Sequence, residues 1–190
     1  MKELLFVVDM VNGFVKEGSM HDQKIMNIVD SIKLECESHE HTIFIADTHE
    51  SDAIEFNSFP LHCVKGTSEA EIIDELKPYV TTLIEKNSTN TFHVLDKEIL
   101  NDYDSFMLVG CCTDICVMQF ALSLKTYLNQ MNMVKQVVVK ENAVATYDAP
   151  YHNANEYHKM AVRSKAPHRK KARTISGTQM ASPMAMTEVS

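Results

Sequence analysis

Short, continuously apolar runs alternate with helix-like stretches along most of this chain. Five such runs occur, at residues 4–8, 42–46, 81–84, 106–109 and 137–139. Each is too short to be a buried helix and is apolar on consecutive positions, which is typical of strands buried on both faces of a parallel sheet. Their alternation with helices predicts an α/β fold whose strands are joined by right-handed crossovers.

The stretches between the runs have helical spacing. Apolar residues recur every three or four positions over residues 22–37 and again over residues 114–129. These stretches predict two helices of ordinary length. A third, shorter helix is predicted around residues 72–76, ending before Pro78.

Length and charge divide the chain into two parts. Its 190 residues fit one domain with a tail, and its net charge is −8. Residues 1–162 carry 12 basic and 25 acidic side chains, whereas residues 163–190 carry six basic side chains and one acidic side chain. We therefore predict a folded domain over 1–162 and a basic, disordered tail over 163–190. The acidic domain argues against nucleic acid as a required partner.

The sequence also indicates in which cellular compartment the protein is expected. No apolar run approaches the roughly 20 residues that span a membrane, and the N-terminal run of five lacks a signal-peptide cleavage site. The five cysteines are an odd number, which favours reduced thiols over a disulfide framework. We expect a cytoplasmic protein without a membrane partner, in which a special cysteine would be a nucleophile or a ligand.

Reactive side chains follow the first four predicted strands. Asp9 follows the first run, Asp47 and His49 follow the second, Lys86 follows the third, and Gly110 with the segment Cys111–Cys116 follows the fourth. Ligands bind outside the carboxyl ends of the strands in sheets of this kind. An acid, a metal-type cluster, an amine and a thiol should therefore meet at one edge of the sheet.

Cys116 has two interpretations at this point. In the first turn of the helix predicted from about residue 114, the helix dipole would lower its pKa and unpaired backbone N–H groups could receive an oxyanion. It could equally be a small buried packing residue. Asp9 could accept a thiol proton or cap a turn, and Lys86 could pair with Asp9 or be an ordinary surface lysine.

The segment after the second strand has the composition of a metal site. Its four candidate ligands are Asp47, His49, Glu55 and His62. Mixed nitrogen and oxygen ligands suit zinc, manganese or iron with positions left for water or substrate. Phe14 and Phe59 could sandwich a flat ring, with core packing as the competing interpretation.

Six segments together carry a resemblance to a known family. They are residues 8–14 (Val-Asp-Met-Val-Asn-Gly-Phe), 47–49 (Asp-Thr-His), 59–63 (Phe-Pro-Leu-His-Cys), 85–86 (Glu-Lys), 110–117 (Gly-Cys-Cys-Thr-Asp-Ile-Cys-Val) and 145–150 (Ala-Thr-Tyr-Asp-Ala-Pro). In these segments the sequence resembles the isochorismatase-like cysteine hydrolases, and within them the nicotinamidases. The resemblance implies a three-layer fold around a doubly wound, mainly parallel sheet. Because no apolar run follows Met160, we expect the usual last strand to be lacking.

The resemblance also implies roles for the candidate residues. Asp9, Lys86 and Cys116 would form a catalytic triad, and the backbone N–H groups of Cys112 and Cys116 would form the oxyanion hole next to a cis Cys111–Cys112 peptide. Asp47, His49, Glu55 and His62 would hold one divalent metal ion, with zinc expected first and manganese or iron as alternatives. Phe14 and Phe59 would stack on the substrate ring.

The function implied is metal-assisted hydrolysis of nicotinamide to nicotinic acid and ammonia through a thioester on Cys116. Two other functions stay open. One is a related cysteine hydrolase that acts on another small amide or a carbamoyl compound. The other is a non-catalytic member of the family that binds a small molecule. The resemblance is also compatible with a homo-oligomer.

Overall fold

The five apolar runs form one parallel sheet. The computed structural model describes residues 2–165, and in that range the strands are β1 (Glu3–Val8), β2 (Thr42–Asp47), β3 (Leu83–Lys86), β4 (Ser105–Cys111) and β5 (Gln136–Ala145). The strand order is β3-β2-β1-β4-β5, and every neighbouring pair is parallel. The predicted α/β class with a doubly wound parallel sheet is confirmed.

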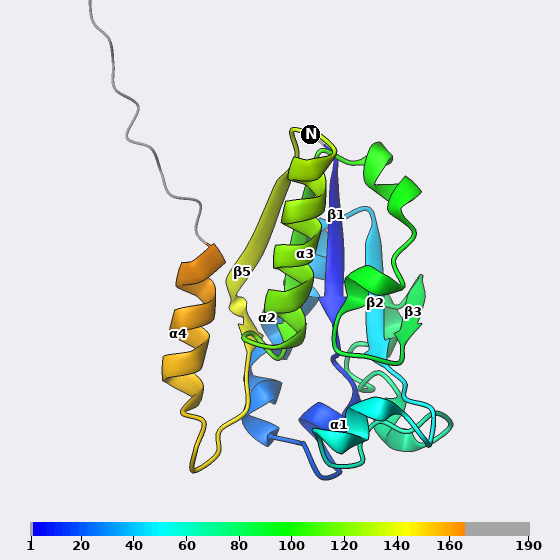
Figure 1. Cartoon of the computed structure of the whole chain (residues 1–190), viewed down its shortest axis with the longest axis vertical. Coiled ribbons are helices and arrows are strands. Elements are labelled where there is room, and N and C mark those ends of the chain that lie inside the picture. The colour runs from blue at the N-terminus through cyan, green and yellow to red at the C-terminus, as the bar shows by residue number, and fades with distance from the viewer. Residues whose placement is uncertain (1, 166–190) are drawn as a thin grey trace, which may run out of the picture.

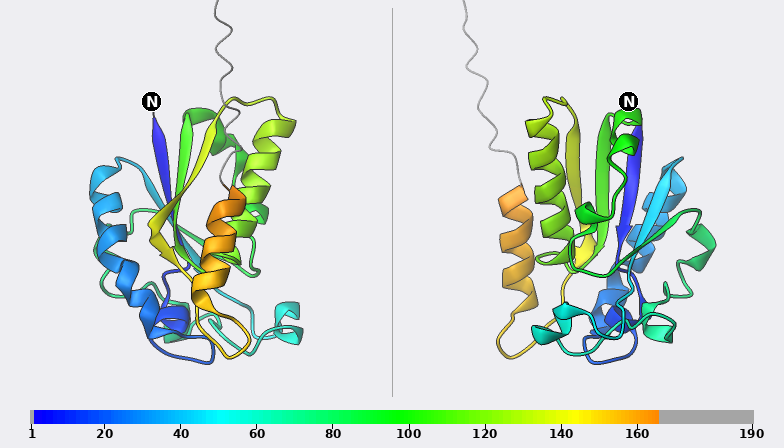
Figure 2. Two further views of the ribbon diagram at one scale, coloured as in Figure 1. Left: turned by 90° about the vertical axis from the view of Figure 1, so that its left-hand side faces the viewer. Right: turned by 45° about the vertical axis from the view of Figure 1, so that its right-hand side comes forward.

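Helices cover both faces of the sheet and make the fold three-layered. The α-helices are α1 (Asn12–Val15), α2 (Val29–Ser38), α3 (Cys116–Gln130) and α4 (Ala154–Lys165). Short 3-10 helices occur as η1 (Gln23–Ile28), η2 (Ile54–Asn57), η3 (Ser68–Ala70), η4 (Lys77–Tyr79), η5 (Thr91–His93) and η6 (Lys97–Asp102). Helix α2 lies on one side of the sheet, and α3 and α4 lie on the other (Figures 1 and 2).

Alternate residues of the central strand, β1, pack into two separate hydrophobic cores, one on each face of the sheet. Leu5 and Val7 of β1 belong to the cluster that contains Ile32 of α2. Phe6 points to the opposite face and meets the ring of Phe120 in α3 edge-on, with the ring centroids 5.0 Å apart. A strand that is buried on both faces reads as an unbroken apolar run, and this explains why the sequence signal for β1 is so clear.

Four of the predicted elements differ from the structure. The strand predicted over 137–139 extends over Gln136–Ala145, and the helix predicted over 22–37 begins as the 3-10 helix η1. Strand β3 begins at Leu83 and ends at Lys86, two residues later than predicted, so Lys86 is the last residue of the strand. The helix predicted around residues 72–76 is wrong. Ile72 instead forms a β-bridge with Val11, and Pro78 lies in the first turn of η4. The buried side chains of this segment have helical spacing, but its backbone pairs with the chain that follows β1.

The C-terminal predictions are covered only in part. Residues 2–165 contain five strands and no sixth, and β5 is an edge strand of the sheet. Helix α4 continues to Lys165, beyond the predicted boundary at residue 162. The remainder of the predicted tail, 166–190, lies outside the described residues. Over residues 2–165, no helix is both long enough and apolar enough to cross a membrane.

The sheet order places the candidate site at a topological switch point. From β1, the chain continues to β2 and β3 on one side, whereas β4 and β5 lie on the other side. The loops that follow β1 and β4 therefore part from each other and leave a crevice at the carboxyl end of the sheet. The loops after the strands gather at that end, opposite the N-terminus (Figure 1).

Gly110 is required for the close approach of β1 and β4. Its φ is +110°, and a Cβ atom there would lie 2.0 Å from the carbonyl oxygen of Val8. We expect Gly110→Ala to lower the free energy of unfolding by at least about 3 kcal/mol, because it adds overlap to backbone strain. Gly66 has φ +81° but nothing within 4 Å, so Gly66→Ala should lower it by only about 1 kcal/mol. Urea unfolding compares the two variants, and equal losses would contradict the role assigned to Gly110.

Candidate active site

A buried lysine joins two buried carboxylates at the centre of the site. Asp9 follows β1, and Asp47 and Lys86 are paired residues at the ends of β2 and β3. The Lys86 Nζ lies 2.9 Å from Asp9 Oδ2 and also donates a hydrogen bond to Asp47 Oδ1. The contact with Asp9 is an ion pair. All three side chains are almost fully excluded from water.

The three charges set one another's proton affinity. Burial, and then repulsion by Asp47, raise the pKa of Asp9 from 3.8 to about 7, although Lys86 acts against both. Burial alone would raise the pKa of Asp47, but Lys86 and His49 together outweigh it through attraction and hydrogen bonds, and the pKa is lowered. Burial alone would lower the pKa of Lys86, but Asp47 and Asp9 raise it well above its ordinary value. Lys86 is thus a permanent cation, Asp47 is ionised, and Asp9 titrates near neutrality.

Cys116 lies beside these carboxylates as the first residue of α3. One ligand-type atom from each of Asp9, Asp47 and Cys116 lies within 4.8 Å of the others, which brings the thiol close to Asp9. The lowered pKa expected from the helix dipole is wrong: burial raises the pKa of Cys116 well above its ordinary value, and Lys86 offsets this only in part. The resting side chain is therefore a thiol, and its reaction as a nucleophile needs a base.

The loop from β4 to α3 is held by its own backbone. The Cys111–Cys112 peptide is cis, as the resemblance implied. The carbonyl of Cys112 accepts hydrogen bonds from the N–H groups of Ile115 and Val117, both at 3.2 Å. The N–H of Cys116 stands at the first position of α3, where a helix offers no acceptor of its own. An N–H so placed is available to an oxyanion.

Three of the four predicted metal ligands lie together. Ligand atoms of Asp47, His49 and His62 are all within 4.8 Å of one another, and the three side chains are buried. Backbone pairing brings the histidines together: the N–H of His49 donates to the carbonyl of Cys63 at 2.9 Å, and the imidazole centroids are 4.6 Å apart. The donor set is the mixed nitrogen and oxygen set that divalent metals accept.

The unpaired atoms of this group fit a metal ion. Both ring nitrogens of His49 and Oε2 of Glu55 are buried without a hydrogen-bond partner among the described residues. Buried polar atoms of this kind are uncommon unless they serve a ligand. Nδ1 of His62 lies 2.7 Å from the carbonyl oxygen of Pro60, so it carries the proton and leaves Nε2 free. Metal-binding histidines are commonly oriented in this way.

The two histidines differ in proton affinity. Burial lowers the pKa of His62, which keeps the ring neutral and able to coordinate a metal. Burial also acts to lower the pKa of His49, but Asp47 and Glu55 outweigh it and the pKa is raised. A position flanked by two carboxylates favours a positive charge. A proton and a metal cation would compete for this ring.

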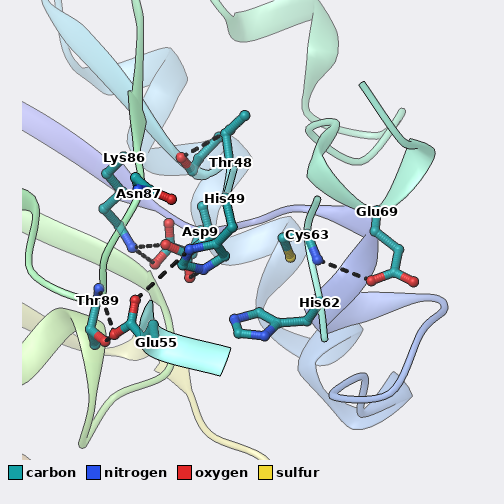
Figure 3. Close-up of polar contacts among 12 residues, drawn as sticks. Asp9, Thr48, His49, Glu55, His62, Cys63, Glu69, Lys86, Asn87 and Thr89 are labelled. Carbon is teal, nitrogen blue, oxygen red and sulfur yellow. Dashed lines mark hydrogen bonds and ion pairs between the residues drawn. The ribbon is translucent and has the colours of Figure 1, made fainter. Parts of the chain in front are cut away.

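Glu55, the fourth predicted ligand, is held at the edge of the group by a residue that the sequence analysis missed. Its Oε2 lies 3.9 Å from Nδ1 of His49. Its Oε1 accepts hydrogen bonds from both the N–H of Thr89, at 3.1 Å, and the Thr89 hydroxyl (Figure 3). Thr89 follows β3 in the loop after Lys86, and no motif in the sequence marks it.

A small pocket opens onto the thiol and the ligand group. Its lining contains Asp47, Glu55, His62, Cys112 and Cys116, together with Phe14, Met20, Phe59, Thr89 and Ile115. The ring centroids of Phe14 and Phe59 lie 5.6 and 6.3 Å from that of His62, so both predicted aromatic residues line the pocket. The sequence analysis did not assign Met20 or Ile115 to the pocket, because Met20 lies outside the quoted segments and Ile115, although within 110–117, has an apolar side chain without a chemical role.

The sequence and the structure of this chain are both similar to those of known amide hydrolases. The sequence pattern of the isochorismatase domain matches residues 3–166. Nicotinamidase 1 of Arabidopsis thaliana is 31% identical over 182 residues, covering 80% of this chain and 72% of the plant protein. The crystal structure of nicotinamidase PncA from Bacillus subtilis is 27% identical with a TM-score of 0.67, covering 86% of this chain and 93% of that one. N-carbamoylsarcosine amidase from Thermoplasma acidophilum is 26% identical, also with a TM-score of 0.67, covering 87% and 93%.

The raised pKa of Asp9 predicts a pH-dependent effect of its removal. Between pH 5 and about 7 the native wild type holds a proton on Asp9 that the unfolded chain has lost, so its stability falls as pH rises. Asp9→Asn removes this contribution. We expect its free energy of unfolding, relative to wild type, to increase by about 2 kcal/mol from pH 5 to pH 8.

The measurement is chemical unfolding across that pH range with a chelator present, so that metal binding does not contribute. Asp74→Asn is the control, because Lys77 lowers the pKa of Asp74 and keeps it ionised throughout the range. Its difference from wild type should stay flat. Parallel curves for Asp9→Asn and wild type would show that Asp9 does not titrate in this range.

Proposed function

The chain belongs to the isochorismatase family and is a hydrolase of amide C–N bonds, and on this premise we propose that it converts nicotinamide to nicotinic acid and ammonia. The observation that carries the proposal is the placement of two different chemistries at one pocket. Cys116 and His62 both line it, the first next to a carboxylate base and the second within a group of metal-type ligands.

The pocket suits a flat, uncharged amide. Two phenylalanine rings line it, Phe14 and Phe59, and aromatic rings favour stacking with flat rings. None of the described lining residues is a lysine or an arginine, and the neighbouring cation, Lys86, lies between Asp9 and Asp47. A substrate carboxylate would find no free cationic side chain in this lining. Nicotinamide, a neutral aromatic carboxamide, meets these conditions.

In the first half of the proposed reaction, Asp9 removes the proton of the Cys116 thiol. The raised pKa of Asp9 makes it a stronger base than an ordinary carboxylate, and Lys86 holds it in place. The sulfur then forms a bond to the amide carbon. The backbone N–H groups of Cys112 and Cys116 stabilise the oxyanion of the tetrahedral intermediate. Asp9 returns its proton to the nitrogen, the C–N bond breaks, and ammonia leaves a thioester on Cys116.

In the second half, water replaces ammonia. Asp9 takes a proton from a water molecule, whose oxygen attacks the thioester carbon. The same two N–H groups stabilise the second tetrahedral intermediate. The C–S bond breaks, the sulfur regains a proton from Asp9, and nicotinic acid is released. Lys86 stays protonated throughout, because both neighbouring carboxylates raise its pKa.

We further propose that Asp47, His49 and His62, with Glu55 beside them, hold one divalent metal ion, with zinc as the first candidate. The buried and unpaired nitrogens of His49 support this assignment. When bound there, such an ion would supply Lewis-acid chemistry to a substrate atom that carries a lone pair, such as the ring nitrogen of nicotinamide. His62 carries its proton on Nδ1, so its free Nε2 can act as a ligand.

A second candidate substrate is a small carbamoyl compound. The likeness to N-carbamoylsarcosine amidase supports it, because the identity and TM-score nearly equal those of the nicotinamidase structure. The lack of a cationic side chain in the pocket lining disfavours a substrate with a carboxylate. Ammonia release from the two substrates, compared at equal enzyme concentration, decides between them. Release from the carbamoyl compound alone would overturn nicotinamide as the substrate.

Removal of the thiol should abolish turnover without unfolding the protein. We expect Cys116→Ala to lower kcat for ammonia release from nicotinamide by at least about 1000-fold, because no other group would form the thioester. Cys36→Ala is the matched control, since Cys36 lies on α2, away from the pocket lining, and should keep wild-type activity. Normal turnover by Cys116→Ala would refute the proposed nucleophile.

Loss of a histidine ligand should reduce metal content and activity together. We expect His49→Ala to lower zinc affinity by about 100-fold or more, because the remaining ligands are too few for a closed site. His41→Ala removes a histidine that packs edge-on against Tyr103, and its affinity should equal that of wild type. Equilibrium dialysis with zinc measures both variants. Equal affinities in the two variants would place the metal elsewhere or exclude it.

A substrate analogue tests the proposed contact between the metal ion and the ring nitrogen of nicotinamide in the wild-type protein. Benzamide has the shape of nicotinamide without the ring nitrogen. If the metal holds that nitrogen, kcat/KM for benzamide should be lower by about 10-fold or more, in line with the loss of one good contact. Equal values for the two amides would separate the metal from substrate recognition.

A further inference from the structure

A buried histidine–aspartate pair, His152 and Asp114, has no part in the mechanism above. Asp114 belongs to the cysteine loop, which is residues 112–116 at the junction of β4 and α3. Nε2 of His152 lies 2.8 Å from Oδ2 of Asp114, and both side chains are at most 7% exposed. The other ring nitrogen, Nδ1, lies 2.9 Å from the carbonyl oxygen of Tyr147. A carbonyl oxygen only accepts hydrogen bonds, so Nδ1 donates to it. The ring thus meets an acceptor at each nitrogen.

The imidazole is also fixed on both of its faces. The Tyr147 ring stacks on it at 4.1 Å with an interplanar angle of 6°, and the Tyr157 ring stacks on the other face at 3.9 Å and 22°. Two backbone hydrogen bonds of 2.9 Å between Ala149 and His152 close the turn that carries it. A side chain held at both nitrogens and both faces has little freedom to move.

Asp114 connects this histidine to the cysteine loop. It lies midway in the sequence between Cys112 and Cys116. The N–H groups of these two residues form the proposed oxyanion hole, and the thiol of Cys116 is the proposed nucleophile. Its Oδ1 is buried and has no hydrogen-bond partner among the described residues, so the carboxylate depends on His152. A second contact supports the same loop, between the Thr113 hydroxyl and Nδ1 of His158 in α4 at 3.1 Å.

We propose that His152 is a positioning residue for the cysteine loop: through its hydrogen bond to Asp114 it holds the N–H groups of Cys112 and Cys116 at the distance that the reaction needs. His152 does not line the pocket and touches no reacting atom, so it acts only through Asp114. The kinetic part of this proposal rests on the proposed amidase function. The structural part, that His152 controls the loop, does not.

Two substitutions separate the hydrogen bond from the stacking. His152→Phe keeps a flat ring between the tyrosines but loses both hydrogen bonds, and His152→Gln keeps a donor near the position of Nε2 but loses the ring. We expect His152→Phe to lower kcat for nicotinamide by about 100-fold with KM within about threefold of wild type, as small misplacements near reacting groups do. His152→Gln should recover kcat to within about 10-fold of wild type.

A second readout does not depend on the substrate. The rate at which iodoacetamide alkylates Cys116 reports the loop geometry even if nicotinamide is not hydrolysed. We expect His152→Phe to change this rate by at least about 10-fold, with His152→Gln near wild type and the alkylation of Cys36 unchanged in all variants. Zinc affinity should stay at the wild-type value, because Asp114 is not among the metal-type ligands. His41→Phe is the control, since it replaces a histidine that packs on another tyrosine, Tyr103.

Each outcome leads to a decision. If His152→Phe alters the alkylation rate of Cys116 but the wild-type protein does not hydrolyse nicotinamide, the positioning role stands and the proposed substrate is rejected. Ammonia release by His152→Phe at the wild-type rate would overturn the positioning role and leave the function intact. Equal losses in His152→Phe and His152→Gln would also overturn it, because a variant that keeps the hydrogen-bonding group would then be no better than one that lacks it.

If His152→Phe does not fold, Asp114→Asn gives the same information. It replaces the hydrogen bond to a carboxylate with a weaker bond to a neutral amide, and it leaves no unpaired carboxylate in the interior. We expect this variant to be folded and to have a kcat about 10-fold below wild type. Wild-type kcat and wild-type alkylation in a folded Asp114→Asn protein would reject the proposal.

Discussion

The ion pairing of Lys86 with Asp9 and Asp47 is the interaction on which the rest of the site depends. These side chains lie at the ends of three adjacent parallel strands and have almost no contact with water. Removing one member of such a group leaves an uncompensated charge in the interior, which costs about 3–5 kcal/mol. The lysine therefore holds Asp9 beside the thiol. It also leaves Asp47 directed toward the histidines.

Much of the fold could be predicted from the sequence because its strands are buried on both faces. The run at 4–8 is apolar on every position, and β1 occupies the centre of the sheet. The edge strand β3 is different: Leu83 is 45% exposed and Glu85 is exposed, so hydrophobicity does not define its ends. Its register is set by pairing with β2, which the sequence alone does not reveal. The segment around Ile72 was misjudged for a related reason, because long-range pairing with Val11 outweighs its local helical spacing.

The candidate site was predictable to the extent that strand ends and residue types determine it. Asp9, Lys86 and Cys116 meet because parallel strands end at one edge of the sheet, and His49 meets His62 because their loop folds back on itself. The support for Glu55 was not predictable, since Thr89 reaches it from a separate loop. The proton affinity of Cys116 was also misjudged. The sequence places it at a helix start, but only the fold reveals that the thiol is buried beside two carboxylates, which raise its pKa together with burial.

Asp47 has one oxygen in each of two assemblies. Oδ1 accepts a hydrogen bond from Lys86, and Oδ2 lies 3.7 Å from Nε2 of His49. Substitutions at different residues of this site therefore affect different numbers of its functions. Changes at the two histidines would separate the proposed metal binding from the proposed thiol chemistry, whereas a change at Asp47 would affect both at once. A descendant chain that no longer bound the proposed metal ion could lose its histidines one by one. It would keep an acid at position 47 for as long as it kept a buried lysine at position 86.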